Sequence, residues 1–112
     1  MPSLVIHVEE NVYKNINNPE LEDVEHNLIQ TLIKELEAEK ENCQIVWVYS
    51  KILTSKYKVF GELKFRDTKN RDDIKKGRCL EKIGKVLKNK FKVKIRLRSF
   101  SINDSLITAL DL

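Results

Sequence analysis

Few residues of this 112-residue sequence have the chemistry of a reactive centre, and the first of them is Pro2. If Met1 is removed, Pro2 exposes a secondary amine, and its ring holds that amine rigidly because the ring fixes the backbone angle φ. The other reactive side chains are His7, His26, Cys43 and Cys79. Their spacing matches no zinc motif, so we expect no metal site, no cofactor and two unpaired thiols.

The residues that follow Pro2 indicate how it is positioned. In MPSLVIHVEE, apolar residues alternate with polar ones, as in a half-buried β-strand (Leu4, Ile6 and Val8 against Ser3, His7 and Glu9). Proline is tolerated at the first residue of a strand, where a missing N–H costs no ladder hydrogen bond. We therefore expect Pro2 at the start of a strand and at the edge of a core.

The next predicted element is a helix that starts at Pro19. Asn18 is the expected N-cap, Pro19 the first helical residue, and acidic residues follow in the first turn. Apolar residues recur at helical spacing over about twenty residues; they are Leu21, Val24, Leu28, Ile29, Leu32, Ile33 and Leu36.

A second helix is predicted over residues 72–91, capped by Asn70 or Asp72. Its expected apolar stripe is Ile74, Cys79, Leu80, Ile83, Val86, Leu87 and Phe91. Gly77 and Gly84 lie seven residues apart, so both are expected to let the helix approach the sheet closely.

Three further strands are predicted over residues 43–53, 57–65 and 92–102, since these segments are rich in β-branched and aromatic residues or alternate in polarity. Gly61 indicates a bulge or a sheet edge.

The order β-α-β, repeated once, predicts an α+β fold, a two-layer α/β domain spanning residues 1–112, with a four-stranded sheet and both helices on one face. Oligomerisation is the expected cover for the other face, and the tail after residue 102 adds a helical turn or reaches a neighbour.

Charge is distributed unevenly along the chain. Residues 1–50 contain ten acidic and three basic residues, a formal charge of −7, whereas residues 51–112 contain seven and eighteen, a charge of +11. A basic stripe on the second helix (Lys75, Arg78, Lys82 and Lys85) allows a nucleic-acid surface, but no binding motif accompanies it. We favour compensation between an acidic and a basic helix. No apolar run is long enough to cross a membrane, and we expect a cytoplasmic protein.

The motifs and their order resemble the tautomerase superfamily, and within it the 5-carboxymethyl-2-hydroxymuconate isomerase branch. The resemblance rests on MPSLVIHVEENV, on VWV around Trp47, on GELKF, and on RDDIKKGRCLEKIGKVLKNKF, in which Arg71 precedes a helix that ends at Phe91. It implies a homotrimer in which Pro2, after removal of Met1, is the general base of a keto-enol tautomerase or isomerase. An α-amino group titrates near pH 8, and burial or nearby cations lower that pKa, which leaves a neutral base.

Substrates of this branch are small, acidic, unsaturated keto acids, so the resemblance also implies cationic binding residues. Arg71 matches by its spacing to Phe91, and Lys64, Arg66 and Lys69 are nearby alternatives. The chain departs from the branch before Trp47, where Asn42, Cys43 and Gln44 stand in place of an arginine. The alternative is a catalytically inactive protein of the same fold that binds an anionic ligand or nucleic acid.

Overall fold

The computed structural model describes residues 2–68 and 71–112, which form one sheet and one layer of helices. The strands are β1 (Ser3–Glu9), β2 (Gln44–Ser50), β3 (Val59–Arg66) and β4 (Ile95–Ile102). The helices are α1 (Glu10–Lys14), α2 (Asn18–Leu36) and α3 (Asp73–Phe91), with short 3-10 turns η1 (Lys40–Asn42) and η2 (Asp104–Leu106). Helix α1 was not predicted; the other helices and the four strands were.

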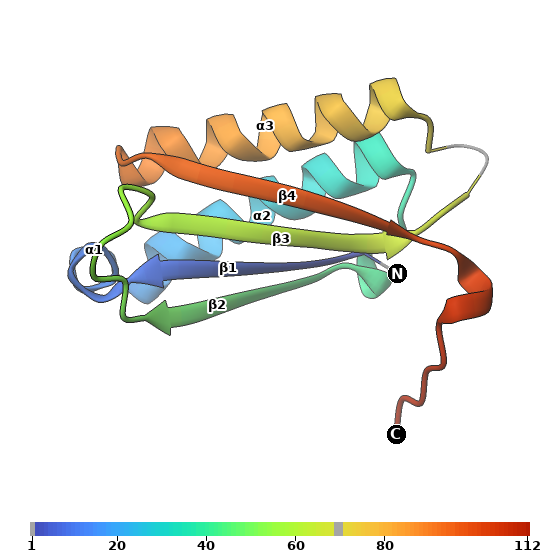
Figure 1. The fold of residues 1–112 in the computed structure, drawn as a ribbon, viewed down its shortest axis with the longest axis horizontal. Helices are drawn as coiled ribbons and strands as arrows, with labels where there is room; N and C mark the ends of the chain where they lie inside the picture. Colours follow the sequence, from blue (N-terminus) through green and yellow to red (C-terminus); the bar gives the residue numbers. More distant parts are fainter. Residues whose placement is uncertain (1, 69–70) are drawn as a thin grey trace.

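The sheet has the strand order β2-β1-β3-β4. Strands β1 and β2 are parallel, as are β3 and β4, so each pair with its helix is a β-α-β unit. The two units meet through the antiparallel pair β1–β3 at the centre of the sheet. The prediction of a duplicated β-α-β unit with both helices on one face is confirmed (Figure 1).

Alternation along the strands sorts the side chains into two faces. Leu4, Ile6 and Val8 of β1 are fully buried against the helices, and the core continues through Leu63 and Phe65 of β3. The opposite side of the sheet, here called the open face, is not covered by helix. Its side chains on the described strands include Ser3, Val5, His7, Val46, Val48, Phe60, Glu62, Lys64, Arg66, Arg96, Arg98 and Phe100.

Helix α2 begins one residue earlier than predicted. Asn17, not Asn18, is the N-cap: its side chain accepts a hydrogen bond from the Glu20 N–H at 2.9 Å. The Glu20 carboxylate accepts one in return from the Asn17 N–H at 3.4 Å. This reciprocal capping box satisfies two backbone donors that the first helical turn leaves free.

The expected stripe of α3 is correct except at its first residue. Cys79, Ile83 and Leu87 are buried, whereas Ile74 is 76% exposed. Ile74 and Ile83 are nine residues apart, which is two and a half turns at 3.6 residues per turn, so they lie on opposite sides of the helix. Asp72 caps α3, accepting from the Lys75 N–H at 2.8 Å, and Asn70 lies outside the described residues.

The glycine expectations need two corrections. Gly61 lies in regular pairing within β3, an interior strand, where it marks neither a bulge nor an edge. A Cβ there would lie 2.9 Å from Leu97 Cδ2, so the glycine makes room for this side chain of β4. A Cβ at Gly84 would lie 3.4 Å from Leu97 Cδ1, so this glycine also lies close to β4. A Cβ at Gly77 would meet no atom of the described residues within 4 Å. Only one of the two helical glycines therefore serves close packing on the sheet.

Candidate functional site

Pro2 lies at the end of the sheet where β1 begins, and its side chain is fully buried. Its carbonyl accepts a hydrogen bond from the Gln44 N–H of β2 at 3.0 Å. The proline thus extends the β1–β2 pairing by one bond through its acceptor, without needing the donor that it lacks. The expectation of a strand-leading proline at the edge of the core is met.

A small cavity of about 140 Å³ lies on the open face. Ser3, the residue that follows Pro2 in the sequence, forms part of its wall. It is lined by Ser3, Lys64, Phe65, Arg66, Ile102 and Ile107. Ser3 pairs with Lys64 across the antiparallel strands, which brings two of the predicted cationic residues, Lys64 and Arg66, to the start of β1. The cavity therefore combines an apolar wall from the C-terminal segment with two cations.

The two cations of the cavity differ in their surroundings. Lys64 is exposed, with its ammonium 6.0 Å from the centre of the Phe100 ring. The Arg66 side chain is 40% exposed and its Nη1 lies 3.1 Å from a carboxylate oxygen of Asp104. Arg66 Nε is buried and has no hydrogen-bond acceptor among the described residues. An unsatisfied buried donor is costly, so this arginine has capacity for a further anionic acceptor.

Arg71 is held differently, and most of its side chain is inaccessible. It is 8% exposed, and its Nε donates to the Leu36 carbonyl at 2.9 Å while Nη1 donates to the Arg66 carbonyl at 2.8 Å. Leu36 is the last residue of α2, where carbonyls lack partners within the helix. The guanidinium therefore links the end of α2 to the end of β3 through these two hydrogen bonds. We call Arg71, Leu36 and Arg66 the frame of the site. Lys69, the fourth predicted cation, lies outside the described residues.

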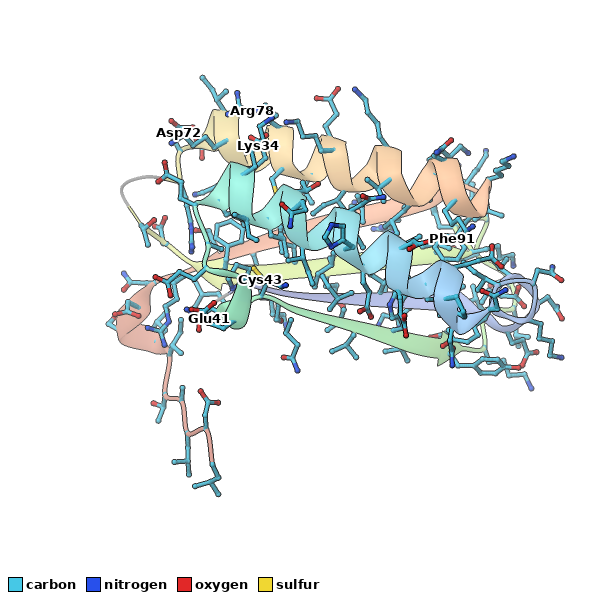
Figure 2. All side chains as sticks on the ribbon, turned by 180° about the vertical axis from the view of Figure 1, so that it is seen from behind. Lys34, Glu41, Cys43, Asp72, Arg78 and Phe91 are labelled. Carbon is cyan, nitrogen blue, oxygen red and sulfur yellow. The ribbon has the colours of Figure 1, made fainter. Side chains whose placement is uncertain are left out.

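Cys43 lies beside this frame, immediately before β2 (Figure 2). Burial raises the pKa of its thiol, and the positive charge of Arg71 acts in the opposite direction. Burial likewise raises the pKa of Cys79, in α3, to about 12. Both cysteines are free. Protonated thiols are poor nucleophiles, so neither cysteine is prepared for nucleophilic chemistry.

The predicted compensation between the helices is confirmed. Glu35 of α2, only 3% exposed, accepts hydrogen bonds from Arg78 at 2.5 Å and from Lys82, both on α3. Lys90 and Glu20 form a further pair at 2.6 Å. Figure 2 shows Arg78 on the outer side of α3, next to the C-terminal part of α2. Much of the basic stripe is thus engaged with α2, although the sequence did not reveal that Glu35 itself is buried.

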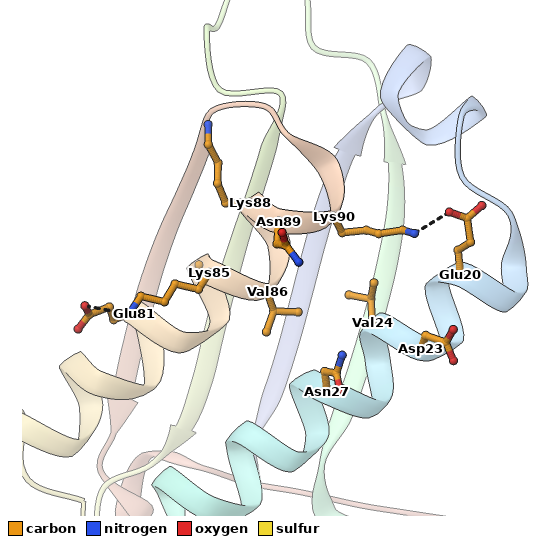
Figure 3. A pocket seen from close by; sticks show the side chains of 11 residues that line it. Glu20, Asp23, Val24, Asn27, Glu81, Lys85, Val86, Lys88, Asn89 and Lys90 are labelled. Carbon is orange, nitrogen blue, oxygen red and sulfur yellow. Dashed lines mark hydrogen bonds and ion pairs between the residues drawn. The ribbon is translucent and has the colours of Figure 1, made fainter.

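A wider groove of about 870 Å³ runs between α2 and α3, at the end of the helices opposite to Pro2 (Figure 3). Its lysines are engaged within the chain. Lys85 pairs with Glu81 at 3.7 Å, Lys90 pairs with Glu20, and Lys88 donates to the Val93 carbonyl at 3.0 Å. The small cavity that begins at Ser3 is the better candidate, since Lys64 and Arg66 line it, Arg66 has a buried donor without an acceptor among the described residues, and the predicted base Pro2 lies one residue before it in the chain.

The aromatic and histidine side chains have structural partners. Trp47 donates to Glu25 of α2 at 2.7 Å and packs against Phe91. His7 lies 3.0 Å from the Ser50 hydroxyl and stacks on Phe60 with ring centres 4.3 Å apart.

Across residues 2–68 and 71–112, no cluster of three or more His, Cys, Asp or Glu side chains is arranged to hold a metal ion. None of the described helices has the length and apolar character needed to span a bilayer.

Comparison with known proteins finds similarity in structure but not in sequence. No protein-family model matches the chain, and no curated protein sequence matches it. Solved structures match over 96% of this chain. One is N1, a member of the cis-3-chloroacrylic acid dehalogenase family, with 13% identity, 79% of its chain covered and a TM-score of 0.77.

Two other matches extend this comparison. A macrophage migration inhibitory factor-like protein from Entamoeba histolytica has 14% identity, 94% of its chain covered and a TM-score of 0.74. A fused 4-OT described as an asymmetric trimer has 10% identity, 91% coverage and a TM-score of 0.74. At such low identity the likeness is one of fold. The four-stranded mixed sheet with two helices on one face is therefore a tautomerase-like fold, shared with these proteins.

Proposed function

We propose that this chain is a keto-enol tautomerase or isomerase of a small, acidic, unsaturated keto acid, with Pro2 as its general base after removal of Met1. The observation that carries the proposal is the placement of Pro2 at the start of β1, one residue before a cavity lined by Lys64 and Arg66. The tautomerase-like fold supports the same reading. A closer relation to the 5-carboxymethyl-2-hydroxymuconate isomerase branch is part of the proposal.

The base depends on the chemistry of the Pro2 nitrogen. With Met1 attached, this nitrogen is a tertiary amide without basicity; once it is the terminus, it is a secondary amine. Burial and neighbouring cations both lower the pKa of an amine, which favours the neutral form near pH 7. The buried ring fixes the position of this base. Such a base removes a proton from the carbon next to a carbonyl and returns it elsewhere on the conjugated system.

The cations have a complementary role in the proposed reaction. Removal of the proton leaves negative charge on the carbonyl oxygen, while an acidic substrate brings a carboxylate as well. Lys64 and Arg66 line the cavity where both charges would be stabilised. Arg71 has two donors committed to backbone carbonyls, so in this proposal it positions the site and contacts substrate only through its remaining N–H groups.

A homotrimer and a cytoplasmic location belong to the same proposal. The open face carries Phe100, which is 43% exposed, and the segment after β4 exposes Leu106, Leu110 and Leu112. Burying these side chains between protomers is favourable. Sedimentation velocity of the purified chain tests the oligomer, and a monomer at micromolar concentration would contradict it.

The activity is tested with two preparations that differ only in residue 1. One retains Met1 and the other begins at Pro2, and intact mass verifies each. Ketonisation of a small enol dicarboxylate is followed by ultraviolet absorbance. We expect turnover only in the trimmed chain and a loss of about a hundredfold or more in trimmed Pro2→Ala, the usual contribution of a general base. Equal rates in both preparations, or none above the uncatalysed rate, would overturn the proposal.

The second candidate is the inactive protein of the same fold that binds an anion. The specific observation in its favour is that Pro2 is fully buried, whereas the cations Lys64 and Arg66 are accessible from the cavity. Binding of a small carboxylate by a trimmed chain without turnover would select this candidate over the enzyme.

A further inference from the structure

The cavity lined by Ser3, Lys64 and Arg66 is partly closed by the C-terminal segment. Ile107 forms part of its lining, and Asp104, at the start of η2, pairs with Arg66 from the same segment. The loop that leads there is anchored, because the Asp67 N–H donates to the Ile102 carbonyl at 2.8 Å. Asn103 also caps η2 by accepting from the Ser105 N–H at 3.0 Å. The position of Asp104 over Arg66 is thus built into the fold.

The pair between Arg66 and Asp104 is incomplete. A carboxylate that binds a guanidinium in its preferred way accepts two parallel hydrogen bonds. Asp104 lies 3.1 Å from Nη1 alone, and Arg66 Nε remains buried without an acceptor among the described residues. The Asp104 side chain is 69% exposed, and ion pairs this exposed are weak. A ligand carboxylate that reaches both nitrogens therefore has an advantage over Asp104.

We propose that Asp104 is a specificity-determining residue of this site: it competes internally for Arg66, and a ligand enters only if its carboxylate can engage both Nε and Nη1. This inference rests on the proposed function, since it takes the cavity as the substrate site. Anions that offer a single contact point, such as chloride, do not displace Asp104. The volume of about 140 Å³ equals that of roughly five water molecules, so the cavity has room for a short ligand, and under the proposed function this ligand is a short 2-oxo acid.

Direct titration tests this competition without relying on turnover. The full chain is labelled at its isoleucine methyl groups, and pyruvate is added while the signals of Ile102 and Ile107 are followed by NMR. Removing the competitor by Asp104→Asn should tighten pyruvate binding about threefold, in line with the strength of an exposed ion pair. Chloride affinity should rise more, because chloride cannot displace Asp104 from the wild-type site, so the preference of the wild-type chain for carboxylate over chloride falls in the variant.

Two controls separate competition from a general effect of charge. Asp111→Asn removes an acid of the same segment, and we expect it to change pyruvate affinity by less than half of the Asp104→Asn effect. Arg66→Lys cannot donate two parallel bonds, so adding Asp104→Asn to it should give little further tightening. Equal effects of Asp104→Asn and Asp111→Asn, or a full effect in the Arg66→Lys background, would overturn the inference.

The outcome is distinguishable from that of the proposed function. Tighter pyruvate binding in Asp104→Asn, without turnover by the trimmed wild-type chain, supports the competition while refuting the enzyme. Turnover by the trimmed chain with no effect of Asp104→Asn refutes the competition alone.

Discussion

Replacing Arg71 by methionine should lower the free energy of unfolding more than replacing a surface arginine does. Methionine keeps an unbranched apolar stem but removes the donors to the Leu36 and Arg66 carbonyls, at 2.9 and 2.8 Å. It also removes a cation that lies 5.7 Å from the centre of the Phe65 ring. The substitution thus unlinks the end of α2 from the end of β3, where the candidate site lies.

The magnitude follows from the two hydrogen bonds. Bonds to a charged group contribute about 1.5 to 3 kcal/mol each, so the pair amounts to roughly 3 to 6 kcal/mol. Methionine does not leave a buried charge behind, and water can reach carbonyls at the end of a helix, so we expect about 3 kcal/mol. For a domain of this size that loss lowers the melting temperature by roughly 10 °C.

The assay is urea unfolding followed by circular dichroism, at one protomer concentration because assembly would add to stability. Arg98→Met is the matched control: Arg98 is exposed and its Nη1 donates only to the carbonyl of its neighbour Leu97, at 2.8 Å. We expect it to change the free energy of unfolding by less than about 0.5 kcal/mol. Coincident unfolding curves for Arg71→Met and Arg98→Met would refute the reasoning and return Arg71 to the list of residues available for substrate.

Two further predictions concern the helices and their packing on the sheet. Hydrogen bonds from Lys82 and Arg78 lower the pKa of Glu35 below its ordinary value of 4.5, so this carboxylate stabilises the fold above that pH and ceases to do so as pH falls through its lowered pKa. Thermal unfolding of wild type and Glu35→Gln should therefore differ at pH 7 and converge as the pH falls through this lowered pKa; a constant difference would show that the charge is not responsible. Gly77→Ala should stabilise the chain by about 0.5 to 1 kcal/mol through helix propensity, because its Cβ meets no described atom within 4 Å. Gly61→Ala should destabilise it by about 1 kcal/mol, because its Cβ would lie 2.9 Å from Leu97 Cδ2; equal shifts of the two variants in denaturant midpoint would contradict this packing argument.

The long helices and the strands could be predicted because the residue patterns that indicate them are local in the sequence. Pro19 and the acidic residues after it mark the start of α2, and apolar residues then recur once per turn. In β1, polarity alternates with a period of two, and Pro2 precedes it where no donor is needed. These preferences act within a few residues, so the duplicated β-α-β order is readable without knowing any tertiary contact.

The pairing of charged residues between the helices was predictable only in outline. An acidic first half and a basic second half indicated that α2 and α3 would compensate each other. Which acid is buried depends on how the two helices are rotated and spaced, and that is fixed by core packing. Glu35 is the acid that meets both Arg78 and Lys82. It lies seven residues after Leu28, on the apolar side of α2, but this spacing does not tell which basic residues of α3 it meets.

By itself, the sequence determined the four strands, the two long helices and the buried side of β1, and it indicated the candidate residues Pro2, Lys64, Arg66, Lys69 and Arg71. The tertiary structure decided which cations are accessible. Arg71 satisfies carbonyls from two elements that are distant in sequence, and Arg66 meets Asp104 through a 3-10 turn that follows the last strand. Hydrogen bonds between distant segments depend on the packed geometry of the whole chain, and no local pattern of residues records them.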